Sequence, residues 1–190
     1  MKKGYTIVEV SILLVIFIIV AFLVAPFTVD DTMQAKNISK WIAAQSDFSN
    51  IVYHLKNSKV SNKAELEEFF DSMLVSEFKE QLEPYSIKYM NGADYPLKFD
   101  TYQKTIYNTT IAYKLYEKPQ GDKFGLLMYD VNGKKGPNRW GKDIFGYNIY
   151  QDRFEPFCKA DTKALQAKDC SRGGTGLCCS NYYLLGGNIE

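Results

Sequence analysis

Residues 10–29, "VSILLVIFIIVAFLVAPFTV", are the stretch of sequence that decides the expected fold. None of these twenty residues carries a formal charge, and the apolar run is interrupted only by Ser11, Pro26 and Thr28. A helix rises about 1.5 Å per residue, so about 20 apolar residues span a hydrocarbon core of about 30 Å. The sequence therefore predicts a membrane-spanning helix.

The charges on either side of this run predict its orientation. Lys2 and Lys3 precede the run and Asp30 and Asp31 follow it, and positively charged flanks stay on the cytoplasmic side. We therefore expect a single pass through the inner (cytoplasmic) membrane, with the rest of the chain outside the cytoplasm. A cleaved secretory signal peptide is the alternative, but its apolar core has only about 7 to 15 residues, and Glu9 would weaken it.

The residues just before the apolar run, "GYTIVEV" from Gly4 to Val10, carry a specific pattern. It resembles the class III signal of type IV pilins and type II secretion pseudopilins, in which a basic leader ends in glycine, an aromatic residue follows, and a glutamate lies four positions beyond the aromatic. Gly4, Tyr5 and Glu9 occupy these positions. The family usually has phenylalanine in place of Tyr5, and many members have a proline where Pro26 lies.

The resemblance implies a processing step. Prepilin peptidase, a different protein, would cut between Gly4 and Tyr5 and methylate the new amino group of Tyr5. Residues 1–4 would be the leader peptide, and residues 5–29 would remain as the anchor in membrane lipid and later as the filament core. The chain would then be a substrate and a structural subunit, not an enzyme.

The resemblance also implies an assembly role for Glu9. A carboxylate in an apolar helix normally has a partner, and the amino group of Tyr5 in a neighbouring subunit would fix the axial register of the filament. Alternatively, Glu9 only favours the positive end of its own helix. The implied partners are other copies or homologous pilin subunits and an inner-membrane assembly platform, and the product is a periplasmic or cell-surface filament.

The helical pattern continues beyond the apolar run. Residues 30–57 have apolar residues at three- and four-residue steps, which is typical of an amphipathic helix, and we expect one helical spine from Tyr5 to Lys56. Pro26 should kink or loosen this spine. A second helix is predicted to begin near Asn62, with Glu65 placed for a capping box, and to end before Pro84.

The remainder of the chain has the texture of a sheet. Runs at 109–117, 123–131 and 143–152 are rich in Tyr, Ile, Phe and Val and are separated by turn residues, which predicts antiparallel strands. The expected fold class is α+β. A long N-terminal amphipathic and transmembrane helix would form the spine, and residues 58–190 would form a head with a C-terminal antiparallel β-sheet, together giving a pilin-like ladle.

The stretch "DVNGKKGPNRWGKD", residues 130–143, is dense in oxygen-bearing side chains. Calcium prefers such oxygen ligands, and some major pseudopilins bind calcium in a loop of the head. The candidate ligands are Asp130, Asn132, Asn138, Asp143 and a backbone carbonyl near Lys134. The loop is not an EF-hand, because Lys134 and Lys135 stand where another ligand and the glycine should be, and no glutamate closes it. The alternative is that the Asn-Gly pair at 132–133 forms a hairpin turn that needs no metal.

All four cysteines, Cys158, Cys170, Cys178 and Cys179, lie near the C-terminus. An even number of cysteines in an exported segment predicts disulfides, and their spacing does not fit a zinc site. Adjacent cysteines do not pair readily. Two connectivities stay open: Cys158–Cys178 with Cys170–Cys179, or Cys158–Cys179 with Cys170–Cys178. Either would hold the C-terminal tail on the sheet, as in many pilins.

Composition argues against several other classes of function. Lys plus Arg exceed Asp plus Glu by one, a formal net charge of +1, so direct contact with nucleic acid is not expected. No catalytic motif is present, and His54, the one histidine, is expected to be an ordinary spine residue. The competing function is a minor pilin or surface adhesin that recognises a ligand through exposed tyrosines.

Overall fold

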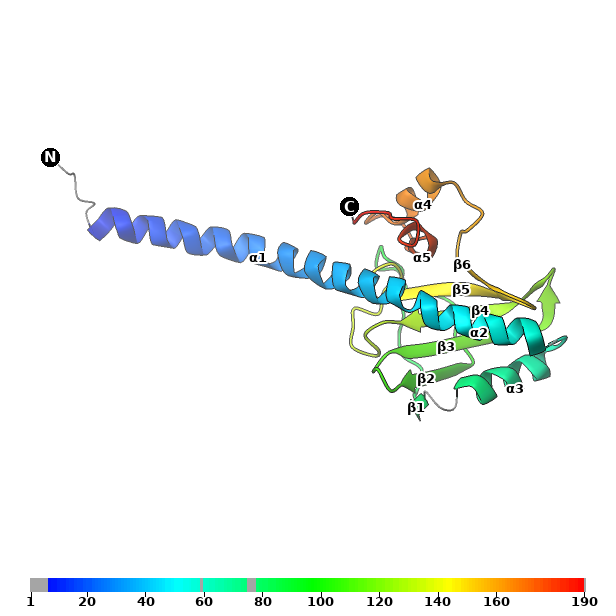
Figure 1. Ribbon diagram of the computed structural model, residues 1–190. Helices are drawn as coiled ribbons and strands as arrows, with labels where there is room; N and C mark the ends of the chain where they lie inside the picture. Colours follow the sequence, from blue (N-terminus) through cyan, green and yellow to red (C-terminus); the bar gives the residue numbers. More distant parts are fainter. Residues whose placement is uncertain (1–6, 59, 75–77, 190) are drawn as a thin grey trace. The chain divides into compact units, whose positions relative to one another are not determined.

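The computed structural model describes residues 7–58, 60–74 and 78–189, without the side chains of 24–30, 73–74 and 78–79. The chain divides into two compact units, Met1–Lys36 and Asn37–Glu190. The second unit is an α+β domain with a six-stranded antiparallel sheet (Figure 1). The class of this domain therefore agrees with the sequence-based expectation.

The first unit contains most of helix α1 (Ile7–Ala43). The large apolar side chains between Ile7 and Leu23 are 44% to 87% exposed. In the part of the chain that the structure describes, however, no helix combines the length and the apolar character needed to cross a membrane. The membrane-spanning helix predicted for residues 5–29 is corrected accordingly.

The predicted spine is two helices rather than one. A turn at Ala44 separates α1 from α2 (Gln45–Ser58), although hydrogen bonding runs through it: the Ala44 amide donates to the Lys40 carbonyl at 3.0 Å, and the Phe48 amide donates to the Ala44 carbonyl at 3.1 Å. The predicted end at Lys56 is close to the observed one. Pro26 lies inside α1, which is helical from Ile7 to Ala43; its side chain is not described, and the kink stays a prediction.

Helix α3 (Lys63–Leu74) begins where the sequence predicts and ends early. Its first turn is a capping box: the Glu65 amide donates to Asn62 Oδ1 at 3.0 Å, and the Ser61 amide donates to Glu65 Oε2 at 2.7 Å. The predicted continuation towards Pro84 is wrong, because Phe78–Gln81 forms strand β1 against β2. Pairing with a distant strand overrides the local helical pattern there.

The sheet is a meander in which every strand pairs antiparallel with the next along the chain. The strands after β1 are β2 (Thr101–Thr105), β3 (Thr110–Gln120), β4 (Lys123–Asp130), β5 (Ile144–Tyr150) and β6 (Phe154–Pro156). The three predicted strands correspond to β3, β4 and β5, and the short outer strands were not predicted. Short helices α4 (Lys163–Asp169) and α5 (Cys179–Tyr182) follow the sheet.

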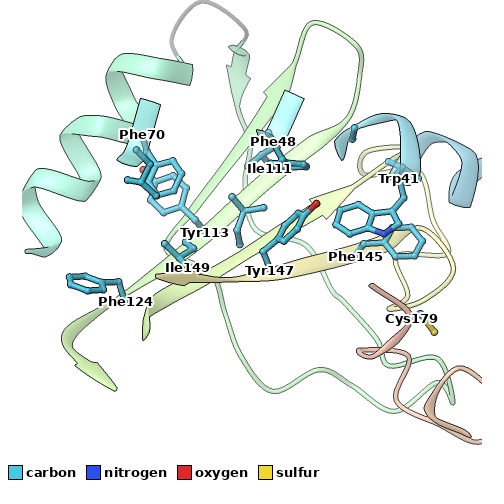
Figure 2. Close-up of a cluster of buried hydrophobic side chains, with 14 of the residues drawn as sticks. Trp41, Phe48, Phe70, Ile111, Tyr113, Phe124, Phe145, Tyr147, Ile149 and Cys179 are labelled. Atoms are coloured by element: carbon cyan, nitrogen blue, oxygen red, sulfur yellow. The ribbon is translucent and has the colours of Figure 1, made fainter. Parts of the chain in front are cut away.

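Within the second unit, the helices pack on one face of the sheet through an aromatic-rich core (Figure 2). Trp41, at the end of α1, is fully buried, stacks on Phe145 with ring centroids 5.0 Å apart, and donates its indole N–H to the Ser180 carbonyl at 3.0 Å. Side chains such as Phe48 and Tyr147 extend this core. A second buried cluster covers the opposite face, because alternate strand residues point to opposite sides of a sheet.

Candidate functional site

The connection between β4 and β5 brings together the two aspartates of the predicted calcium loop. Asp130 is the last residue of β4, and Asp143 directly precedes β5. The register pairs Asp130 with Ile144, and the Val131 amide donates to the Asp143 carbonyl at 2.9 Å. Both aspartates are fully buried, with 0% exposure. The two ends of the loop therefore bury two carboxylates next to each other.

Asp143 organises the interior of the loop. Its carboxylate accepts the backbone amides of Asn138 at 2.9 Å and Arg139 at 2.7 Å, and the side-chain amide of Asn132 at 3.3 Å. Burial raises the pKa of Asp143, and these hydrogen bonds act in the opposite direction. The connection spans 131–143, so it is a long folded loop and not the two-residue hairpin turn that the Asn-Gly pair suggested.

Asp130 is held by a residue that the sequence did not point to. The Tyr85 hydroxyl donates to Asp130 Oδ2 at 2.6 Å, and the Asn132 amide donates to Asp130 Oδ1 at 3.2 Å. Burial raises the pKa of Asp130 well above its ordinary value, the Tyr85 hydrogen bond lowers it, and the neighbouring charge of Asp143 raises it. Tyr85 lies 45 residues from Asp130, too far along the chain for any local pattern to link them.

Two buried amide oxygens lie in the same loop without a hydrogen-bond partner among the described residues: Asn132 Oδ1 and Asn138 Oδ1. The side-chain amide of Asn138 reaches the Lys134 carbonyl at 3.5 Å. Unsatisfied buried oxygens are unfavourable, and calcium takes six to eight oxygen ligands. The five predicted residues thus belong to one loop with two buried carboxylates and two unpartnered amide oxygens, and calcium binding there stays a prediction.

Two of the lysines that would oppose a cation lie on the surface of the loop. Lys134 and Lys135 are exposed, so water screens their repulsion. The loop is also tied to the helical layer of its own unit: Lys40 Nζ donates to the Val131 carbonyl at 3.0 Å, and the Asn37 side chain donates to the Lys142 carbonyl at 3.3 Å. Two hydrogen bonds therefore join the loop to the end of α1.

The cysteines form two disulfides, Cys158–Cys178 and Cys170–Cys179, with Cα atoms 5.0 Å and 5.3 Å apart. This is the first of the two connectivities that the sequence left open. Asp161 lies near one of them, with Oδ2 3.8 Å from Cys178 Sγ. Because both sulfurs of that pair are consumed in the disulfide, Cys158, Asp161 and Cys178 do not offer a thiolate site for a metal.

Comparisons with protein-family models, with curated proteins and with solved structures find no match. The pilin-like signal therefore stays a prediction from sequence. Its cleavage residues, Gly4 and Tyr5, lie outside the described residues. Glu9 lies in the first turn of α1 and is exposed.

The other residues considered from sequence have ordinary surroundings. His54 is exposed on α2, with its ring 5.6 Å from that of Tyr53. Most of the described tyrosines are buried or half-buried in the core, and the exposed ones are Tyr53 and Tyr107. The tyrosines thus serve mainly in packing, which gives little support to a broad adhesive tyrosine surface.

Proposed function

We propose that the chain is a structural subunit of a type IV pilus-like or type II secretion pseudopilus filament. In this proposal prepilin peptidase cuts between Gly4 and Tyr5 and methylates Tyr5, and an assembly platform then adds the subunit to a filament outside the cytoplasm. The N-terminal segment mediates assembly, while the disulfide-bonded α+β domain faces outward.

The observation that supports this proposal most strongly is the exposed apolar surface of α1. Side chains such as Ile7, Phe17 and Phe22 are 87%, 74% and 78% exposed. Contiguous exposed apolar patches on monomeric proteins rarely exceed a few hundred Å², and larger ones mark interaction surfaces. Copies of the same helix, packed side by side, would cover these side chains from all directions.

Glu9 gives this packing a preferred register. In the proposed filament its carboxylate pairs with the amino group of Tyr5 in a neighbouring subunit. The apolar side chains alone permit many axial offsets, whereas a charge pair in an apolar environment is strongly unfavourable when its partners are separated. The pair would therefore select one offset.

We also propose that calcium occupies the β4–β5 loop of the outward domain. Asp130, Asp143, Asn132, Asn138 and the Lys134 carbonyl would hold the ion, which would neutralise two buried carboxylates and satisfy the unpartnered amide oxygens. The ion would act structurally, by ordering a loop that contacts Asn37 and Lys40 of α1.

Filament yield from a variant of Glu9 and from a matched variant on α3 tests the proposal. We expect Glu9→Val to leave the level of folded, disulfide-bonded subunit unchanged and to reduce sheared filaments strongly. Glu68→Val removes an exposed carboxylate from α3 and should leave filament yield unchanged. Normal yield from Glu9→Val would contradict the register role, and equal losses from both variants would show that the loss is not specific to Glu9.

A further inference from the structure

The four cysteines include an adjacent pair, Cys178 and Cys179, that makes disulfide formation ambiguous. In the native connectivity Cys178 bonds to Cys158 and Cys179 bonds to Cys170. An exchanged connectivity, Cys158–Cys179 with Cys170–Cys178, differs only by a swap of the two neighbours. A bond between the neighbours themselves is disfavoured, because adjacent Cα atoms lie about 3.8 Å apart, whereas disulfides usually join Cα atoms about 4.4 to 6.8 Å apart.

Chain entropy does not choose between the native and the exchanged connectivity. The native bonds close loops with sequence separations of 20 and 9 residues. The swap lengthens one loop by one residue and shortens the other by one residue, and loop-closure entropy changes only with the logarithm of loop length. The unfolded chain should therefore form the two connectivities in about equal amounts.

The folded domain distinguishes the neighbours through the contacts of α5. Cys179 starts this helix, is fully buried and belongs to the same core cluster as Trp41 (Figure 2). The next residue is Ser180, whose carbonyl accepts the Trp41 indole N–H at 3.0 Å and whose hydroxyl accepts the Gly146 amide at 2.9 Å. The exchanged connectivity would shift α5 by about one residue against these partners, so only the native one is compatible with the full set of contacts.

These selective contacts join residues that are far apart in the chain. Ser180 lies 139 residues from Trp41 and 34 residues from Gly146, whereas the paired cysteines are at most 20 residues apart. Contacts between distant residues cost more loop-closure entropy and form later than local ones. Bonds that form before α5 has docked on the sheet are therefore not guided by the native contacts.

A chain that has formed the exchanged bonds cannot correct them by itself. The sequence has four cysteines, and the native connectivity leaves none of them free; the exchanged connectivity uses all four as well. Disulfides rearrange when a thiolate attacks a disulfide sulfur, and a fully oxidised chain has no thiolate to supply. The attacking thiolate must therefore come from another molecule.

We propose that the chain is a substrate of a thiol–disulfide isomerase, which acts on it before any assembly step. An isomerase thiolate attacks Cys158 of the exchanged Cys158–Cys179 bond, forms a mixed disulfide and releases the Cys179 thiolate. This thiolate attacks Cys170, which forms the native Cys170–Cys179 bond and releases the Cys178 thiolate. Cys178 then attacks Cys158 and releases the isomerase thiolate. The chain has two disulfides before and after, so the reaction consumes no oxidant and no reductant.

Oxidative folding of the full-length chain tests this inference. The reduced chain is diluted from guanidinium into non-ionic detergent with excess diamide, a thiol-free oxidant, and electron-transfer fragmentation between Cys178 and Cys179 then identifies the connectivity. We expect about half of the oxidised chain to be exchanged, and catalytic amounts of reduced protein disulfide isomerase to convert it to the native connectivity. More than about 90% native connectivity without isomerase would overturn the inference, and so would exchanged connectivity that persists with isomerase.

Variants that cannot form the exchanged bonds are the matched controls. Cys170→Ser with Cys179→Ser leaves only the Cys158–Cys178 bond, and Cys158→Ser with Cys178→Ser leaves only the Cys170–Cys179 bond. Isomerase should raise the folded yield of the parent chain about twofold and leave the yields of both variants unchanged, as measured by near-UV circular dichroism. An equal effect on parent and variants would contradict the inference. If neither variant folds, the connectivity of the parent chain decides. Failure here leaves the filament proposal untouched, because no filament is involved.

Discussion

The substitution Asp130→Asn should have opposite effects on stability with and without calcium. Asparagine has nearly the same shape as aspartate but carries no charge. Asp130 is fully buried beside Asp143, and burial raises its pKa well above the ordinary value. In calcium-free buffer at neutral pH, the substitution removes a buried like-charge interaction. The Tyr85 hydroxyl can accept a hydrogen bond from the new amide, so the unfolding temperature should rise or stay constant.

With calcium, the same substitution should remove most of the stabilisation by the ion. A ligand at 100 times its Kd stabilises the folded state by about 2.7 kcal/mol. For a unit the size of Asn37–Glu190, each kcal/mol shifts Tm by about 2–4 °C, so calcium should raise the Tm of the parent chain by about 5–11 °C. Losing one of two carboxylate ligands should reduce that shift to about 1–2 °C at the same concentration.

Thermal unfolding, followed by circular dichroism in chelator and in millimolar calcium, measures both effects. Glu68→Gln, which neutralises an exposed carboxylate away from the loop, is the matched control and should keep the full calcium shift. If the parent chain shows no shift, the loop does not bind calcium. If Asp130→Asn keeps the full shift, the assignment of Asp130 as a ligand is wrong.

Three further predictions follow from the packing and titration of the second unit. Trp41→Ala should cost about 3–5 kcal/mol of stability, measured by urea unfolding, because Trp41 is fully buried and hydrogen-bonded; a cost below 1 kcal/mol would contradict its central place in the core. Replacing Cys158 and Cys178 by alanine should cost about 3 kcal/mol, since their disulfide closes a loop with a separation of 20 residues, and an unchanged midpoint under non-reducing conditions would argue against this pairing. The raised pKa values of Asp130 and Asp143 mean that, between the unfolded value of about 3.9 and the folded value, the native state binds more protons. In chelator, the contribution of these two aspartates to folding stability should therefore fall as pH rises through that window. The Tm of the parent chain should then decrease more with rising pH than the Tm of Asp130→Asn. Parallel Tm-against-pH profiles for the two chains would contradict this prediction.

Features encoded by neighbouring residues could be predicted from the sequence. The capping box at Asn62 and Glu65 is an example, because all its hydrogen bonds lie within one turn. The convergence of Asp130 and Asp143 was also accessible, because both belong to one loop rich in turn residues. Strand β1 was not accessible, because the backbone partners of Phe78–Gln81 lie in β2.

The residues that complete the candidate sites are set by tertiary structure. Tyr85 meets Asp130 only after the sheet has formed, because 45 residues separate them along the chain. Tyr85 is unremarkable in its own sequence neighbourhood.

The mass of the mature N-terminus tests the central claim most directly. The chain would be produced with prepilin peptidase and analysed by mass spectrometry of its N-terminal peptide, beside a Gly4→Val control that removes the proposed cleavage residue. The account predicts a chain that begins at Tyr5 with a methylated amino group, and an uncleaved control. A chain that still begins at Met1, or one cut elsewhere, would contradict it.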